Sequence, residues 1–521
     1  MPSVENTGAQ TSDLEKSATQ KSAPPKSGPW ILAATILGSS MAFIDGTIVN
    51  VAAPKFQSAF HATVVEVQWV IESYGLFLSS LILAGGAVGD WLGRRFAFLI
   101  GVGIFALASA ACGLAPNIHF LIIARAFQGM GAAFLVPGSL AIISACFDRA
   151  SRGRAIGTWS GFTAITTALG PVLGGWLIEH ASWRWAFFLN LPLAAVVIAV
   201  SLRHVPESRD PTAARLDWLG AILATTSLGA LVTGLLESST VGWRHPIVIG
   251  SLAAALLLLI LFFQVEVHSK SPMVSFSLFR SSVFLGANLL TLFLYAALGV
   301  FFFLFPVTLM QVHRYSATAA GAASLPMILL MFSLSRWSGN LTSRYGGKIP
   351  LIVGPLLVAS GFVLFAGVAK GGNYWKTFFP ASVVLGLGMA ITVAPLTTVV
   401  MSAIDKNHSG AASGINNAVS RLAGVLAIAV LGIVLVRAFA THLERSLPAL
   451  SIAPEAAHEI RAKEIELAGM ELPKNLDPTA TTLVRQAVSE SFLAGFRLVL
   501  FCCSALAVAS AAVAWRFVPE K

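Results

Sequence analysis

The sequence predicts an all-α integral membrane protein made of two six-helix pseudo-symmetric bundles and two inserted helices, fourteen transmembrane helices in total. Three observations lead to this fold class. First, 56% of the 521 residues are hydrophobic and only 11% are charged, whereas soluble domains average about 25% charged residues. Second, apolar runs long enough to cross a bilayer recur along the whole chain. Third, one loop motif occurs twice, which indicates an internal repeat.

The predicted crossings are apolar runs bounded by Gly, Pro or charged residues. They lie near residues 30–53, 68–88, 96–115, 119–145, 155–178, 185–203, 216–236, 246–266, 283–308, 317–338, 349–369, 378–401, 411–437 and 491–515. An even number of crossings places both termini on the same side of the membrane. Ahead of the first crossing, residues 1–29 are polar and rich in Ser, Pro and Lys. They are expected to be a disordered cytoplasmic tail.

The repeated motif sets the domain boundaries. "GAVGDWLGRR" at 86–95 reappears as "GNLTSRYGGK" at 339–348. Each copy lies between the second and third helix of a six-helix unit, which leaves the pair at 216–266 as an insert outside the symmetric core. The expected domains are therefore an N-terminal bundle (30–203), a linker with two inserted helices (204–282) and a C-terminal bundle with a long loop at 438–490 (283–521).

Loop charges predict the orientation. The short loops on the N-terminal side carry about twice as many Lys and Arg residues as the opposite short loops, and basic loops stay in the cytoplasm. We therefore expect a multi-pass protein of the inner (plasma) membrane with both termini cytoplasmic and 438–490 outside. Within that loop, a surface helix is expected between Pro454 and Gly469. A further helix that begins near 477–478 is expected to lead into the last crossing.

Several functional classes are not supported by the sequence. The net charge is +10, but the basic residues are scattered, so no nucleic-acid partner is expected. No GxxxxGK[ST] motif is present, so an ion gradient or the gradient of the substrate must supply the energy. We expect no cofactor, no metal site and no disulfide framework. An integral membrane enzyme is the less favoured class, because the histidines form no HExxH motif and no nucleophile elbow is present.

Asp45 is the most informative residue. It lies in "MAFIDGTIVNVAAP" (41–54), near the middle of the first apolar run. A carboxylate at the centre of a transmembrane helix costs roughly 2.5–3.5 kcal/mol, and such residues are usually functional. The alternative is that Asp45 lies at a helix end and reaches water, or only ties two helices together. We expect Asp45 to face a central cavity and to bind a proton and a cationic substrate in competition.

Two neighbouring helices supply further polar groups. Gln68, Glu72, Gly75 and Ser79 follow helical spacing and form a polar stripe on the second helix. Glu72 is the second acid inside the membrane, near the outer end, where solvation by water is the alternative. On the fourth helix, Arg125 is a buried cation that needs an acidic partner, and Asp45 and Glu72 are the acids available in the same half. The proton-coupling candidates are thus Asp45, Glu72 and Arg125.

The C-terminal half contributes polar side chains and no acid within its core. Asn288, Thr291 and Tyr295 form one stripe, and Asn417 with Arg421 forms another. Combined with the polar residues of the first half, the predicted substrate-binding set is Asp45, Asn50, Gln68, Glu72, Asn288, Tyr295 and Asn417.

Two motifs are gating candidates. Asp90, Arg94 and Arg95 lie at a cytoplasmic helix end, where they could pair across the halves in one state only; anchoring of the topology is the alternative. On the fifth helix, small residues follow one face around a proline, and close backbone packing is the alternative to a gate. The gating candidates there are Gly170, Pro171 and Gly174.

Six segments resemble the fourteen-helix drug/proton antiporter branch of the major facilitator superfamily. They are "FIDGTIVNVAAP", "GAVGDWLGRR", "LIIARAFQGMGAA" (121–133), "ALGPVLGG" (168–175), "ASWRWAFFLNLP" (181–192) and "GAASGINNAVSRLAG" (410–424), in the order of that family. Gly46, Thr166 and Ser343 depart from its usual motifs. The resemblance implies alternating access, a fifth-helix gate that resists leak, and an Arg125 that tunes proton binding.

The expected function is therefore proton-coupled efflux of hydrophobic, often cationic drugs or toxic small molecules. A dedicated exporter of one metabolite, peptide or lipid is the alternative, because the fold does not fix the substrate. The expected partners are the small-molecule substrate, protons and the lipid bilayer, with a periplasmic adaptor as a further option. We expect a monomer.

Overall fold

The computed structural model describes residues 27–147, 149–209, 217–238, 241–269, 276–339, 341–368, 373–404, 409–450, 452–473 and 476–520. The predicted disordered tail lies outside the described residues except for its last three. Of those three, Ser27 precedes the first described helix, which begins at Gly28 with a proline in its first turn.

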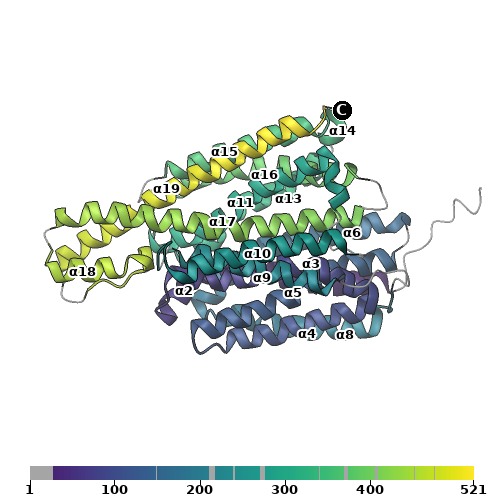
Figure 1. Cartoon of the computed structure of the whole chain (residues 1–521), viewed down its shortest axis with the longest axis horizontal. Coiled ribbons are helices and arrows are strands. Elements are labelled where there is room, and N and C mark those ends of the chain that lie inside the picture. The colour runs from purple at the N-terminus through teal and green to yellow at the C-terminus, as the bar shows by residue number, and fades with distance from the viewer. Residues whose placement is uncertain are drawn as a thin grey trace, which may run out of the picture.

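The N-terminal half is a bundle of antiparallel helices (Figure 1). Its α2 packs on α5, α6 and α8, while α5 also packs on α3 and α4. The helix starts are encoded locally: Thr63 and Glu66 form a capping box, and the Asn117 side chain caps the fourth helix of the half. The helices are α2 (Gly28–Phe60), α3 (Val64–Leu92), α4 (Arg94–Gly113), α5 (Ile118–Cys146), α6 (Arg149–His180), α7 (Trp185–Phe188) and α8 (Asn190–His204).

The C-terminal half forms a second bundle beside the first (Figure 1). In it, α11 packs on α17 and α19, and α15 packs on α16 and α19. Its elements are η1 (Phe276–Arg280), α11 (Ser282–Gln311), α12 (Ala317–Ala322), α13 (Leu325–Gly339), α14 (Leu341–Tyr345), α15 (Lys348–Ala366), α16 (Phe378–Ser402), α17 (Ser409–Ser446), η3 (Leu447–Leu450), α18 (Pro454–Ala462), η4 (Glu464–Gly469) and α19 (Pro478–Phe517).

The helices match the predicted membrane crossings. In the described part of the chain, 12 helices are long and apolar enough to cross a membrane, and α3, which bends by 50° between Ile82 and Ala84, makes a thirteenth. The predicted span at 317–338 coincides with α12 and α13, where a shorter apolar helix covers Ala317–Met331. The all-α membrane fold is confirmed, and the count of fourteen crossings is consistent with these helices.

The internal repeat is visible in the backbone. Gly93 and Gly346, which the two motif copies align, both have positive φ, at 125° and 74°. Gly101 and Gly354, aligned by the same repeat, both pack against another helix of their own half. A Cβ on Gly101 would lie 3.0 Å from the carbonyl oxygen of Gly131, and one on Gly354 would lie 3.0 Å from that of Gly388. The two halves are therefore pseudo-symmetric, as predicted.

The inserted pair lies between the two halves in sequence. It consists of α9 (Trp218–Glu237) and α10 (Pro246–His268). Helix α9 packs on α3 and α17, and α10 packs on α9. Only 11% of the apolar window of α10 is buried, so most of this helix faces outward, as a helix in contact with lipid does. The division of the chain at 203 and 283 stays a prediction.

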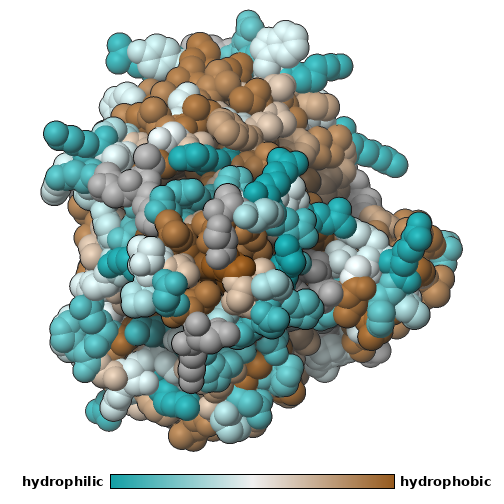
Figure 2. All heavy atoms as spheres, turned by 90° about the vertical axis from the view of Figure 1, so that its left-hand side faces the viewer, coloured by the Kyte–Doolittle hydropathy of each residue, from teal (hydrophilic) through white to brown (hydrophobic). Residues whose placement is uncertain are grey.

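Helices α17 and α19 extend beyond the bundles and form a hairpin with α18 and η4, at the left of Figure 1. We call this the hairpin end, and the opposite end, where the described chain begins and ends, the tail end. The single helix expected between Pro454 and Gly469 is wrong: α18 ends at Ala462, and the 3-10 turn η4 follows, with Leu467 at a φ of 50°. The helix expected from 477–478 is confirmed, because Asp477 caps α19 at Pro478. Hydrophilic side chains gather on the hairpin-end face in Figure 2.

Candidate functional site

Asp45 and Arg125 form an ion pair in the interior of the N-terminal half. Each side chain is 1% exposed, and Nη1 of Arg125 donates to Oδ2 of Asp45. The other carboxylate oxygen, Oδ1, accepts hydrogen bonds from Nε2 of Gln128 at 2.8 Å and from Nδ2 of Asn190 at 3.4 Å. A buried arginine needs an acidic partner, and Arg125 pairs with one of the two acids available in its half.

A polar network surrounds this pair. Oγ of Ser109 accepts from Gln128 at 2.7 Å and from Asn190 at 3.0 Å. Four helices of one half thus contribute: α2, α4, α5 and α8. Arg125 is held further by Nε, which donates to the carbonyl of Val70 at 3.1 Å. Every hydrogen-bond partner of Asp45 named here belongs to the N-terminal half. Its exposure to a central cavity stays a prediction.

Tyr74 forms one wall of the Arg125 site. The guanidinium carbon of Arg125 lies 4.2 Å from the centroid of the Tyr74 ring, and the Tyr74 hydroxyl donates to the carbonyl of Ala42. Close packing of α3 on α5 makes this contact possible. Gly129 faces the backbone of Tyr74 so closely that a Cβ there would collide with the Tyr74 carbonyl oxygen.

Glu72 and Gln68 form a second polar site on α3. Glu72 has no exposed surface and Gln68 is 2% exposed. Among the described residues, neither carboxylate oxygen of Glu72 has a hydrogen-bond partner, and neither does Nε2 of Gln68. Gln68 packs against Gly432 of α17, in the other half. Glu72 is therefore buried in this structure and not at the outer surface.

The candidates of the C-terminal half lie on two neighbouring helices. Nδ2 of Asn416 donates to Oδ1 of Asn288 at 3.2 Å and to Oγ1 of Thr291 at 2.7 Å, which joins α17 to α11. Asn288 is buried, Tyr295 is half-buried and Asn417 is exposed. From the N-terminal half, Asn50 is half-buried on α2.

The loop motif is tied within its own half. Nε of Arg94 donates to Oδ1 of Asp90 at 2.9 Å, and Nη1 of Arg95 donates to the carbonyl of Val205 at 3.1 Å. The Glu207 carboxylate accepts from the backbone amides of Arg95 and Phe96 and so caps α4. No described ion pair joins this motif to the C-terminal half. Its role as a latch between the halves stays a prediction.

The small residues of α6 pack in two directions. Gly170 contacts Thr47 and Gly174 contacts Ile48, both on α2. The carbonyl of Pro171 instead meets Gly321 of α12, across the interface between the halves. Four residues further along α6, Gly175 meets the carbonyl of Ala317. The motif therefore lies where the backbones of the two halves are in contact. Its role as a gate stays a prediction, with close packing as the alternative.

The two halves are also joined by hydrogen bonds at the hairpin end. Nε2 of Gln311 donates to Oε1 of Gln57 at 2.8 Å, and Nε2 of Gln57 donates to the carbonyl of Glu466 at 2.7 Å. Oγ1 of Thr318 donates to Oε2 of Glu179 at 2.6 Å. These bonds connect α2 and α6 of one half to α11, α12 and η4 of the other.

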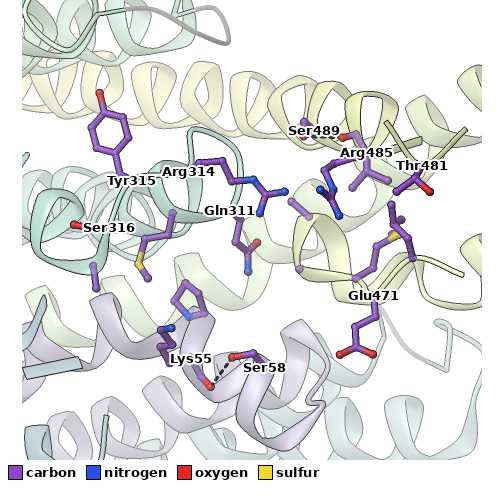
Figure 3. A pocket seen from close by; sticks show the side chains of 18 of the residues that line it. Lys55, Ser58, Gln311, Arg314, Tyr315, Ser316, Glu471, Thr481, Arg485 and Ser489 are labelled. Atoms are coloured by element: carbon purple, nitrogen blue, oxygen red, sulfur yellow. Dashed lines mark hydrogen bonds between the residues drawn. The ribbon is translucent and has the colours of Figure 1, made fainter. Parts of the chain in front are cut away.

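A cavity of about 960 Å³ lies beside these contacts, between the ends of α2, α11 and α19 and the turn η4. Figure 3 shows three basic side chains at this cavity, Lys55, Arg314 and Arg485. Two acidic residues, Glu179 and Glu471, also line it. The cavity contains none of the predicted site residues.

Reasoning from sequence missed Ser109, Asn190 and Asn416. Each is a polar side chain within an apolar helix, so the signal was present. Asn190 lies within "ASWRWAFFLNLP" (181–192), and Asn416 precedes the predicted Asn417. Asn416, and not Asn417, bonds the α11 side chains, and substrate binding by Asn417 stays a prediction.

The sequence is similar to those of known membrane transporters. The family model described as Major Facilitator Superfamily matches residues 35–217 and 211–428. The Multidrug resistance protein Stp of Mycobacterium tuberculosis is 33% identical over 509 residues, 94% of this chain and 92% of that protein. The Tetracenomycin C resistance and export protein of Streptomyces glaucescens is 31% identical over 496 residues, 93% of this chain and 91% of its own.

Solved structures share the fold. An inward-facing bacterial homolog of the human lysosomal transporter Spinster superposes with a TM-score of 0.65 at 17% identity. The superposition covers 95% of this chain and 99% of that one. The POT family transporter PepTSo gives a TM-score of 0.62 at 12% identity and covers 95% and 98% of the two chains.

Proposed function

The chain belongs to the major facilitator superfamily, and we propose from this premise that it exports hydrophobic drugs in exchange for protons. Support for drug export comes from its relatives, which include a multidrug resistance protein and a resistance and export protein that each match more than nine-tenths of the chain. Support for a transport mechanism comes from the pseudo-symmetric halves, because alternating access rocks one such half against the other.

The buried Asp45–Arg125 pair is the observation that carries proton coupling. A carboxylate in this position is pulled in two directions: desolvation favours proton uptake, and the neighbouring guanidinium favours proton loss. Protonation of Asp45 would end the ion pair and leave the Arg125 charge with Gln128 and the Val70 carbonyl. Because Asp45 also contacts Asn190, this event changes how α2, α5 and α8 pack on one another.

Glu72 is proposed as a second proton carrier. A carboxylate charge without a partner costs several kcal/mol in a dry interior, so the neutral acid fits its surroundings better. Glu72 lies one turn from Gln68, which touches α17. Rocking of the halves would change this contact and expose Glu72 to water, where it can release its proton. The remaining candidates, Asn50, Asn288, Tyr295 and Asn417, are proposed to contact the substrate.

The state of the transporter follows from the interface. The halves are bonded at the hairpin end through Gln57–Gln311 and Glu179–Thr318. We assign this state as closed toward the outside, with the hairpin external and both termini in the cytoplasm, as loop charge predicts. We further propose that the protein lies in the plasma membrane and acts as a monomer, and that any periplasmic adaptor would dock at the hairpin end.

Reconstitution tests this function directly. Purified protein in proteoliposomes is given an imposed pH gradient and an ethidium-type dye, and dye movement is followed by fluorescence. The proposal predicts accumulation of dye against its gradient that a protonophore abolishes. Dye movement that persists at the same rate with the protonophore would show that protons do not drive transport.

A further inference from the structure

Arg421 lies between the two halves near the middle of the molecule. It is half-buried on α17, about 18 Å along the helix from Ser409 at 1.5 Å per residue. Its guanidinium carbon is 5.8 Å from the centroid of the Phe43 ring on α2, in the opposite half. Tyr74 of α3 and Tyr295 of α11 also lie near it. Four helices from both halves therefore surround this cation.

Arg421 has no acidic partner among the described residues. None of their ion pairs includes it. Asp45 is paired with Arg125, whose guanidinium also lies over the Tyr74 ring. Neither carboxylate oxygen of Glu72 has a hydrogen-bond partner among the described residues, so Glu72 does not bond Arg421. Among the described residues, therefore, no acid within the apolar helices pairs with the Arg421 charge.

An uncompensated guanidinium at mid-membrane depth is costly and marks a pathway for charged groups. Its surroundings suit a molecule with one charged end. Phe43 and Tyr295, both half-buried, offer aromatic rings to an apolar body.

We propose that Arg421 is the substrate anchor and that the exported substrates carry an acidic group, a carboxylate, sulfonate, phosphate or ionised phenol, on an aromatic or apolar body. This inference rests on the proposed export function and names its substrate class. It differs from the expectation of cationic drugs, which needed Asp45 to be free for the substrate. Asp45 is instead held by Arg125, Gln128 and Asn190.

The cavity at the hairpin end has a matching charge. Its basic residues Lys55, Arg314 and Arg485 form no ion pair among the described residues, and Figure 3 shows Arg314 and Arg485 extending into the space. Of its two acids, Glu179 accepts a hydrogen bond from Thr318, and Oε1 of Glu471 lies 3.7 Å from Nδ1 of His61. An acidic substrate released from Arg421 would therefore meet basic groups on its way out.

Binding by purified protein tests the anchor without transport. The probes are anilinonaphthalene sulfonate and phenylnaphthylamine, which share an aromatic body and differ in the sulfonate. Arg421→Gln should weaken sulfonate binding by about tenfold to a hundredfold, the usual effect of losing a hydrogen bond to a charged group. It should change phenylnaphthylamine binding by less than about twofold. Arg421→Lys should recover part of the sulfonate affinity.

Arg437→Gln, on the same helix but nearer the hairpin end, is the matched control and should leave both affinities unchanged. Equal losses for both probes in Arg421→Gln, or no loss for either, would overturn the anchor. Displacement of the sulfonate by phosphatidylglycerol would support the anion site and identify a lipid headgroup as one source.

The dye transport assay separates this inference from the proposed function. If wild-type protein transports neither the ethidium-type dye nor the sulfonate but binds the sulfonate through Arg421, the export function fails and the anion site stands. If proton-driven export proceeds but Arg421→Gln binds and exports the sulfonate as the wild type does, the anchor fails and the export function stands.

Discussion

Arg125 and Asp45 form an ion pair in which both side chains are 1% exposed, and the pair joins α5 to α2 inside one half of the molecule. The hydrogen bonds of Gln128 and Asn190 to the same carboxylate leave it fully engaged. A proton that binds Asp45 must therefore displace a strong partner. The coupling between proton and substrate depends on this exchange.

The first prediction concerns the stability of the pair. Asp45→Asn leaves a buried guanidinium that cannot lose its proton, so it should lower the free energy of unfolding by about 3–5 kcal/mol. The double variant Asp45→Asn/Arg125→Gln removes both charges and should be more stable than Asp45→Asn alone. Denaturation of the detergent-solubilised proteins measures both. Strictly additive losses would show that the two residues do not interact.

The second prediction separates Glu72 from Asp45. Because no described group bonds the Glu72 carboxyl, Glu72→Gln should change the free energy of unfolding by less than about 1 kcal/mol, the usual value of one hydrogen bond. It should lower the number of protons exchanged per substrate. Simultaneous proton and dye fluxes in proteoliposomes give this ratio. An unchanged ratio would remove Glu72 from the proton pathway.

The third prediction concerns the contact between α6 and α12. A side chain on Gly175 would collide with the carbonyl of Ala317, so Gly175→Val should force the halves apart at the hairpin end. Spin labels on Ser58→Cys and Thr482→Cys, with the four native cysteines replaced by serine, report the separation. Gly103→Val is the control, because a Cβ at Gly103 meets nothing within 4 Å. Equal label distances in both variants would contradict a close contact at this point.

The fourth prediction is a pH dependence of the hairpin. Burial raises the pKa of Glu464, and the charge of Glu444 adds to this effect. Burial also raises the pKa of Glu466, with Lys463 opposing it. A carboxyl whose folded pKa is raised stabilises the fold fully below its ordinary value, about 4.3, and loses this contribution as pH rises through the folded pKa. The hairpin should therefore become more stable as pH falls.

Hydrogen exchange of residues 454–473, corrected for intrinsic rates, measures this effect. Protection should be greater at about pH 5 than at about pH 7 in the wild type, and the difference should shrink in Glu464→Gln/Glu466→Gln. Protection that increases with pH would have the wrong sign for carboxyls with raised pKa values.

The fold could be predicted from sequence because a bilayer simplifies the problem. Apolar length alone locates most helices, and Gly93 and Gly346 revealed the repeat that positive φ later confirmed. The 3-10 turn after Ala462 could not be predicted, because the helical sequence pattern continues through it. Its backbone depends instead on distant contacts, such as the hydrogen bond from Gln57 to the Glu466 carbonyl.

The site was predicted only in part. The partner of Arg125 followed from charge balance, because few acids lie within the apolar helices. The depth of Glu72 could not be predicted, because its burial depends on how α3 packs against α17, which begins 317 residues after α3 ends. A local sequence pattern carries no information about such a contact. The importance of Arg421 could not be predicted, because only the structure shows that no described ion pair includes it and that it lies against Phe43 of the other half.

The central claim is that Asp45 carries the proton that is exchanged for the exported substrate, and substrate-induced proton release tests it most directly. Purified protein in lightly buffered detergent solution is mixed with substrate, and the released protons are counted with a pH dye. The wild type should release protons on substrate addition. Asp45→Asn, and the more stable Asp45→Asn/Arg125→Gln, should bind substrate without this release. Undiminished release from both variants would contradict the claim and place the proton on another group.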